Sequence, residues 1–196
     1  MKHKKPYPLV LITDRKICDA SLTEVMSKFL KKHNAGEALS NCKIDFVVLR
    51  EKDLNIEEYR QMYKLCKEIT DEFSLSLYTN TYLIENVPVH LPYSLFVEMA
   101  EKGELPEKFG VSSHSLEEAI FAEKKGASYL FFSNVFETKC KVGLKGKGLD
   151  ALRNVCSRVN IPVYALGGID EKNMDQVMET GAYGVAIRSL VVDFVG

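Results

Sequence analysis

Short runs of apolar residues alternate with amphipathic segments along the whole chain. The runs are near-continuous stretches of Val, Ile, Leu and Phe, as in strands buried on both faces of a parallel sheet. We predict strands at Leu9–Thr13, Ile44–Arg50, Ser74–Asn80, Val87–Leu91, Phe109–Ser113, Ser128–Val135, Ile161–Leu166 and Gly184–Ile187.

The segments between these runs carry helix signals. Three of them have the spacing of a capping box, in which a polar residue is followed three positions later by Glu, at Ser21–Glu24, Asn55–Glu58 and Ser115–Glu118. Apolar residues within Leu22–Leu30 repeat every three or four positions, as on the core-facing side of a helix.

Eight strands that alternate with helices predict an α/β fold, a single small (β/α)8 TIM barrel with one domain over residues 1–196. Two units are abbreviated. Only Thr81–Val87 separates the third and fourth strands, which is too short for a crossover helix, and Leu190–Gly196 leaves little room for the last helix. A doubly wound open sheet is the alternative, but no G-x-G-x-x-G motif follows an early strand.

The net charge of −1 gives the chain no global field for nucleic acid or for an anionic membrane. Its five cysteines are scattered without a C-x-x-C pair, which argues against a disulfide framework or a zinc site and fits a reducing cytoplasm. The first apolar run, Leu9–Ile12, is too short for a secretory or membrane segment. We therefore expect a cytoplasmic protein without a metal; homo-oligomerisation stays open.

Candidate chemistry lies where the predicted strands end, since barrels carry function at that face. The loop within Ser133–Gly148 holds four lysines and three glycines and suits an anion. Gly167 and Gly168 follow the seventh strand, and Arg188 and Ser189 follow the eighth, where barrels often bind phosphate.

Six segments, in order along the chain, resemble the thiamine phosphate synthase/TenI family. They are Leu9–Asp14, Val48–Lys52, Val111–Ala119, Val135–Lys141, Ile161–Ile169 and Gly184–Ser189. The resemblance implies a (β/α)8 barrel and two activities. One couples hydroxymethylpyrimidine diphosphate to thiazole phosphate with Mg²⁺, and the other tautomerises a carboxythiazole phosphate.

Several residues inherit roles from this resemblance. The ligand contacts that it implies are Arg50, Lys52, Asn80, Ser112, Thr138, Lys141, Gly167, Gly168, Arg188 and Ser189. The run Phe136–Lys141 is closer to the TenI branch than to the synthases.

The chain departs from both branches. Thr81 stands where synthases have a magnesium-binding Asp, and no carboxylate follows the fourth strand until Glu98. Asn134 stands where the tautomerase has its proton-transferring His, and an amide cannot act as a general base. His114, at the end of the fifth strand, can substitute for that base.

These observations favour a TenI-like protein of thiamine metabolism that binds a heterocyclic phosphate. His114 would transfer the proton, and Asn134 would orient the substrate. One alternative is a thiamine phosphate synthase, which alone would need Mg²⁺ as cofactor. The other is a non-catalytic binder or regulator that retains the phosphate site.

Overall fold

The strands run parallel in the order of a closed barrel, β1 to β8, which confirms the predicted fold class. The computed structural model describes residues 5–80, 82–137 and 145–195. Its strands are β1 Tyr7–Ile12, β2 Cys42–Leu49, β3 Ser76–Thr79, β4 Val89–Leu91, β5 Phe109–Ser113, β6 Tyr129–Ser133, β7 Val163–Leu166 and β8 Gly184–Ile187. Its helices are η1 Arg15–Ile17, α1 Leu22–Asn34, α2 Ile56–Glu72, α3 Tyr93–Lys102, α4 Leu116–Lys124, α5 Gly148–Cys156, α6 Met174–Met178 and α7 Leu190–Asp193.

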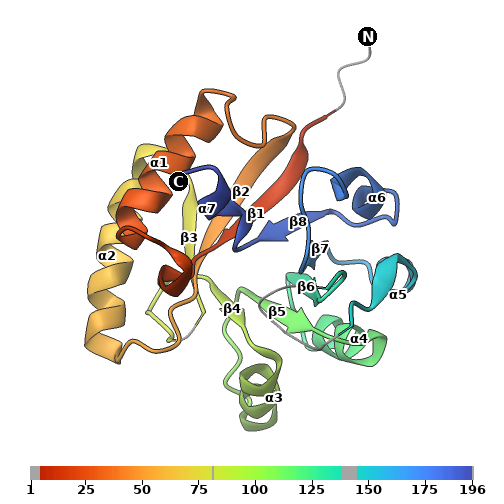
Figure 1. Ribbon diagram of the computed structural model, residues 1–196. Helices are drawn as coiled ribbons and strands as arrows, with labels where there is room; N and C mark the ends of the chain where they lie inside the picture. Colours follow the sequence, from red (N-terminus) through yellow and green to blue (C-terminus); the bar gives the residue numbers. More distant parts are fainter. Residues whose placement is uncertain (1–4, 81, 138–144, 196) are drawn as a thin grey trace. The chain divides into compact units, whose positions relative to one another are not determined.

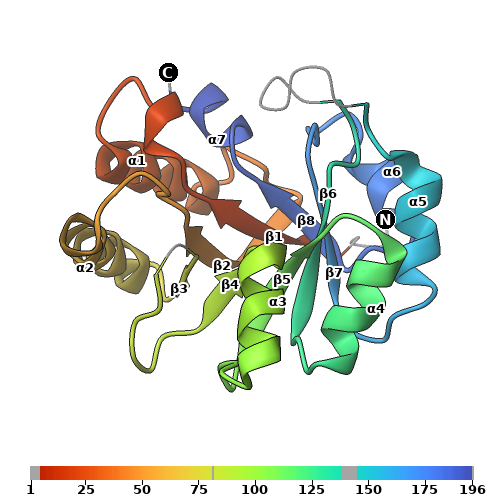
Figure 2. The same ribbon diagram turned by 90° about the horizontal axis from the view of Figure 1, so that it is seen from below.

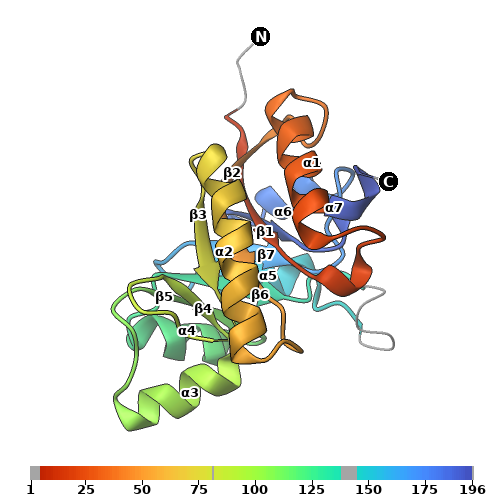
Figure 3. The same cartoon turned by 90° about the vertical axis from the view of Figure 1, so that its left-hand side faces the viewer.

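The contacts of the chain group into two compact units, residues 1–87 with 187–196, and residues 88–186. In the first unit, β2 pairs with both β1 and β3, and α1 lies beside α2 over these strands (Figures 1 and 3). Phe29 and Leu30 of α1 are fully buried, as the apolar repeat predicts. Phe29 also meets Phe194 edge to face, which holds the last residues of the chain against α1.

The second unit contains the continuous ladder from β4 to the start of β8, with α4 beside α5 on its outside (Figure 2). Its core is aromatic, and Tyr129, Phe131 and Tyr164 contact one another through their rings. The ring of Tyr129 fills the space where a side chain at Gly110 would be, since an added Cβ would lie 2.1 Å from its Cζ. Gly110 is therefore a packing requirement of this core.

The local predictions agree with the structure in most places. Ser21 and Ser115 accept hydrogen bonds from the amides of Glu24 and Glu118, and Asn55 forms a complete capping box. No helix occurs among the described residues between β3 and β4, and α7 has four residues, so both abbreviated units are confirmed. Strands β5 and β8 match their predicted bounds, β1 and β2 begin two residues earlier and end one residue earlier, and β3, β4, β6 and β7 are shorter than predicted. The single domain over residues 1–196 stays a prediction.

None of the helices formed by the described residues is long and apolar enough to cross a membrane.

Candidate functional site

Two arginines share one carboxylate in the first unit. Arg50 follows β2 and Arg188 follows β8, and their Nη1 atoms lie 4.0 Å and 3.5 Å from Oδ2 of Asp14, which follows β1. All three side chains are partly buried, with exposed fractions of 28%, 23% and 17% for Arg50, Arg188 and Asp14. One carboxylate thus contacts two guanidinium groups in a setting that screens charge less than bulk water does.

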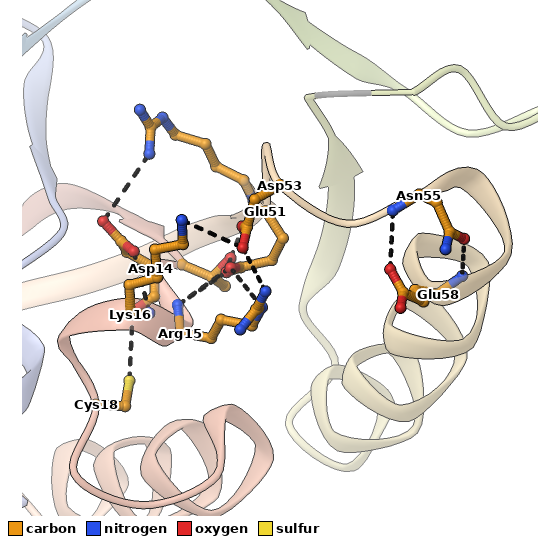
Figure 4. Close-up of polar contacts among 10 residues, drawn as sticks. Asp14, Arg15, Lys16, Cys18, Glu51, Asp53, Asn55 and Glu58 are labelled. Carbon is orange, nitrogen blue, oxygen red and sulfur yellow. Dashed lines mark hydrogen bonds and ion pairs between the residues drawn. The ribbon is translucent and has the colours of Figure 1, made fainter.

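The position of Asp14 follows from its local sequence. It is the N-cap of η1, and its side chain accepts a hydrogen bond from the amide of Lys16. Figure 4 shows its carboxylate directed away from Glu51. Asp14 therefore caps η1 and also pairs with both arginines.

Glu51 contacts the residues on either side of Asp14 and is almost completely buried. Its Oε1 accepts a hydrogen bond of 2.6 Å from the hydroxyl of Thr13, and both carboxylate oxygens accept from the amide of Arg15, at 3.2 Å and 3.1 Å. Burial raises the pKa of the Glu51 carboxyl above its ordinary value, and these hydrogen bonds oppose that effect only in part.

The neighbouring cations are placed differently. Arg15 contacts two carboxylates, Asp53 at 2.5 Å and Glu51 at 3.9 Å, and Lys16 contacts Asp53 at 3.2 Å, so these two cations face two acids. Lys52, a predicted ligand contact, is exposed. Three arginines here are partly buried: Arg50 and Arg188 share the carboxylate of Asp14, whereas Arg15 contacts both Glu51 and Asp53.

A small cavity of about 30 Å³ adjoins the cluster, and Asp14 and Arg188 line it. The rest of its wall is mainly apolar and comes from β1, α1 and the last helix, and includes Leu11, Leu22, Met26, Phe29, Val191 and Val192. Arg188 and the carboxylate-bearing Asp14 thus both border a mainly apolar space.

The second unit holds a neutral network around His90. This side chain is buried, with Nε2 2.8 Å from the hydroxyl of Ser112 and Nδ1 3.2 Å from that of Tyr129. Its ring also stacks on Phe131 at 3.8 Å between centroids. Burial lowers the pKa of His90 to about 3, so the imidazole is neutral at physiological pH and orients Ser112 by a hydrogen bond.

His114, the predicted proton-transfer residue, has a carboxylate partner. Its Nδ1 lies 3.1 Å from Oε2 of Glu118, and the same oxygen accepts a hydrogen bond of 2.6 Å from the His114 amide. The imidazole is 40% exposed. The pair therefore orients the ring, and it also caps the start of α4.

Asn134 is buried, and its amide nitrogen donates to the carbonyl of Phe136 at 3.2 Å. It packs against Gly167, where an added Cβ would lie 2.7 Å from the Asn134 Cβ. At Gly168 an added Cβ would lie 2.4 Å from the carbonyl oxygen of Glu137. Both glycines also have positive φ, 103° and 65°. The loop after β6 packs so closely against Gly167 and Gly168 that neither position can hold a side chain. The predicted contact of these glycines with phosphate stays a prediction.

The remaining predicted residues divide into two groups. Asn80 is buried, with its amide donating to the hydroxyl of Tyr59 at 3.1 Å, and Ser189 is exposed at the start of α7. Thr138 and Lys141 lie outside the described residues. Within the described ranges, no group of three or more His, Cys, Asp or Glu side chains is arranged to hold a metal ion.

Sequence reasoning missed three polar residues of these networks. Glu51 was visible only as the middle residue of the Arg50–Lys52 motif, and Thr13 only as a polar strand end. Glu118 had a usable signal, because it is the third residue of the helix that Ser115 caps and can reach back to His114, just before the cap. The role of Asp14 as a shared partner required the structure, since Arg50 and Arg188 are 138 residues apart in the sequence.

Comparisons with known proteins agree with this architecture. Residues 9–191 match a family described as thiamine monophosphate synthase. A relative from Streptococcus pneumoniae, named thiamine-phosphate synthase 2, is 36% identical over 186 residues, covering 91% of this chain and 84% of its own. Thiamine-phosphate synthase of Clostridium acetobutylicum is 30% identical over 184 residues, covering 93% and 86%.

A solved structure supports the same assignment. Thiamine phosphate pyrophosphorylase from Pyrococcus furiosus has a TM-score of 0.74 and 28% identity, and the match covers 95% of this chain and 88% of that one. These proteins carry names of the synthase side, whereas the motif around Phe136 pointed to the TenI branch. What the motifs and the comparisons share is the family itself: the chain belongs to the thiamine monophosphate synthase family.

Proposed function

We propose that this protein binds phosphorylated precursors of thiamine and couples a hydroxymethylpyrimidine diphosphate to a thiazole phosphate, with release of diphosphate. The names of its relatives favour this reaction over the TenI-like activity that the loop motif suggested. The observation that carries the proposal is the pair of arginines, Arg50 and Arg188, on the single carboxylate of Asp14.

The charge of this cluster suits a phosphate ester. At 3.5 Å and 4.0 Å the ion pairs to Asp14 are longer than charge-assisted hydrogen bonds. A guanidinium has five N–H donors, and among the described residues Asp14 is the ion-pair partner of Arg188. A phosphate oxygen would therefore find donors already ordered by Asp14, in a setting that strengthens the attraction.

The arginines would also serve the chemistry. When the bond between the pyrimidine methylene carbon and the diphosphate oxygen breaks, the electron pair leaves with the oxygen. Fixed positive charge near that oxygen stabilises the transition state more than the ground state. Arg50 and Arg188 would supply this charge, and Lys52 would add to it from the exposed side.

The described acids do not form a magnesium site. Asp14 is paired with two arginines, Glu51 accepts hydrogen bonds from its own neighbourhood, and Asp53 pairs with Arg15 and Lys16. Mg²⁺ prefers carboxylates that are free to coordinate alongside water and phosphate. No step is therefore assigned to a metal.

The proposal is tested by incubating the protein with both substrates and quantifying thiamine phosphate and diphosphate, over a range of Mg²⁺ concentrations. We expect stoichiometric formation of both products. Calorimetry on the same preparation shows whether each substrate binds. If both substrates bind and neither product forms, the synthase proposal is wrong and the binder alternative gains support.

A second candidate function rests on the pair of His114 and Glu118. A carboxylate on Nδ1 fixes the ring and leaves Nε2 to move a proton, as tautomerisation of a carboxythiazole phosphate requires. Asn134 would support it only through hydrogen bonds. Tautomer conversion that is lost in His114→Ala and retained in His33→Ala would favour this candidate; full activity of His114→Ala would remove His114 from the mechanism.

A further inference from the structure

Glu51 is a buried acid that has no assigned role in the proposed reaction. Its carboxylate is 1% exposed, and its nearest cationic atom, Nε of Arg15, is 3.9 Å away. Burying a carboxylate is costly, and removing such a charge in favour of apolar residues is often neutral or stabilising. Stability alone is therefore a weak reason for an acid at this position.

Glu51 accepts hydrogen bonds from the residues immediately before and after Asp14. Thr13, immediately before Asp14, donates its hydroxyl to Glu51, and Arg15, immediately after it, donates its backbone amide. Figure 4 shows Arg15 and Glu51 facing each other, with Asp14 beside them. The backbone on each side of Asp14 is thus tied to one carboxylate.

The same contacts reach Arg50. The hydroxyl of Thr13 that donates to Glu51 also accepts a hydrogen bond of 2.9 Å from the amide of Arg50. Glu51 itself is the next residue after Arg50. The ends of β1 and β2 are therefore joined by hydrogen bonds of 2.6 to 3.2 Å, and Asp14 lies between the two residues, Thr13 and Arg15, that Glu51 holds.

We propose that Glu51 is a positioning residue, which fixes Asp14 so that its carboxylate holds the guanidinium groups of Arg50 and Arg188 in the geometry that receives phosphate. This inference rests on the proposed function, because it assigns the anion to these arginines. It also predicts order in the loop after β1 that is independent of any ligand.

The test uses the full chain and three variants, Glu51→Ala, Glu51→Gln and, as a matched control, Asp53→Asn. Asp53 lies two residues away and contacts the side chain of Arg15, whereas Glu51 contacts its backbone. Amide hydrogen exchange at Arg15 reports the loop, calorimetric titration with inorganic diphosphate reports the anion site, and urea unfolding reports stability.

Glu51→Ala removes the hydrogen bonds that Glu51 accepts from the Arg15 amide and the Thr13 hydroxyl. We therefore expect amide exchange at Arg15 to be about tenfold faster. Because Asp14 is then held less firmly, the dissociation constant for diphosphate should also rise about tenfold. Glu51→Gln can still accept from the Arg15 amide and should recover part of both effects. Asp53→Asn should match the wild type in both measurements.

Each outcome has a distinct meaning. Wild-type protein that does not bind diphosphate overturns the proposed function, while the exchange data still report on the loop. Unchanged exchange at Arg15 in the Glu51 variants overturns the inference, and so does faster exchange with unchanged affinity. If Glu51→Ala does not fold, Glu51→Gln decides by the same two measurements.

Discussion

The polar residues of the two units are organised in opposite ways. In the first unit, Asp14, Arg50 and Arg188 are charged, partly exposed and joined by long ion pairs. In the second, His90 is neutral and fully enclosed, and its hydrogen bonds to Ser112 and Tyr129 lie within an aromatic core. The first arrangement suits recognition of an anion, whereas the second fixes a hydroxyl without charge.

This difference separates two kinds of requirement. Charged groups that keep some exposure retain donors for a ligand, and their geometry depends on supporting residues such as Glu51. Buried neutral groups depend on packing, and their hydrogen bonds are lost only with the core itself. Variants of the two units should therefore differ in whether binding or stability changes.

The largest effect of a single substitution at neutral pH is expected for Gly110→Ala in the second unit. The new Cβ would overlap the ring of Tyr129, with 2.1 Å to Cζ, and that ring is also hydrogen-bonded to His90. We expect a loss of about 3 kcal/mol or more in the free energy of unfolding, measured in urea. Gly103→Ala, where the space is open but φ is 73°, should cost only about 1 kcal/mol. Equal costs would show that the Tyr129 ring does not fix Gly110.

Arg188→Ala should affect binding instead of folding. Arg188, which lies 3.5 Å from Asp14, is one of the two groups that would hold the diphosphate, and its loss should cost about 2 kcal/mol or more of binding free energy, or about 30-fold in the dissociation constant for inorganic diphosphate. Arg153→Ala removes an exposed arginine that pairs with Asp150 on α5, and serves as the control. If both variants bind with the same affinity, Arg188 does not contact the phosphate.

The neutral state of His90 predicts a pH dependence of stability. Its folded pKa of about 3 is below the value of 6.5 for an unfolded chain, so only the unfolded state gains a proton between these limits. The contribution of His90 is present above pH 6.5 and falls by about 1.4 kcal/mol per unit as pH drops toward 3. Unfolding of His90→Gln should lack this slope, while Ser112→Ala, which keeps the imidazole, should retain it. The same slope in His90→Gln and wild type would contradict a neutral His90.

The smallest effect is expected for Tyr59→Phe. The Tyr59 hydroxyl donates to the carbonyl of Leu49 at 2.7 Å and accepts from the amide of Asn80, at the ends of β2 and β3. Phenylalanine removes the hydroxyl that bonds these two backbone groups, at a cost of about 1 kcal/mol in unfolding free energy. Tyr63→Phe, in the same helix, is the matched control. A cost no larger than that of the control would mean that water replaces the hydroxyl.

Much of the fold could be predicted because its signals are local. Apolar runs located all eight strands, and the polar–x–x–Glu spacing located the starts of three helices that the structure caps as expected. Strand ends were less certain, since a polar residue such as Asn80 can be buried by tertiary contacts beyond its strand.

The candidate site was harder to predict, because its partners are distant in sequence. Arg50 and Arg188 were identified as cations at strand ends, but nothing local indicated that Asp14 pairs with both. The two glycines after β7 illustrate the reverse problem. Gly167 and Gly168 were predicted to admit phosphate, and the structure shows that the neighbouring loop already requires them.

The central claim about this site is that Arg50 and Arg188 recognise the phosphate groups of the substrate. The most direct measurement is calorimetric titration of the wild type with hydroxymethylpyrimidine diphosphate and with the unphosphorylated hydroxymethylpyrimidine, at low and high salt. We predict that the phosphate ester binds about 100-fold more tightly at low salt and that added salt narrows the difference. Equal affinities for the two compounds at low salt would contradict the proposal that Arg50 and Arg188 form the phosphate site.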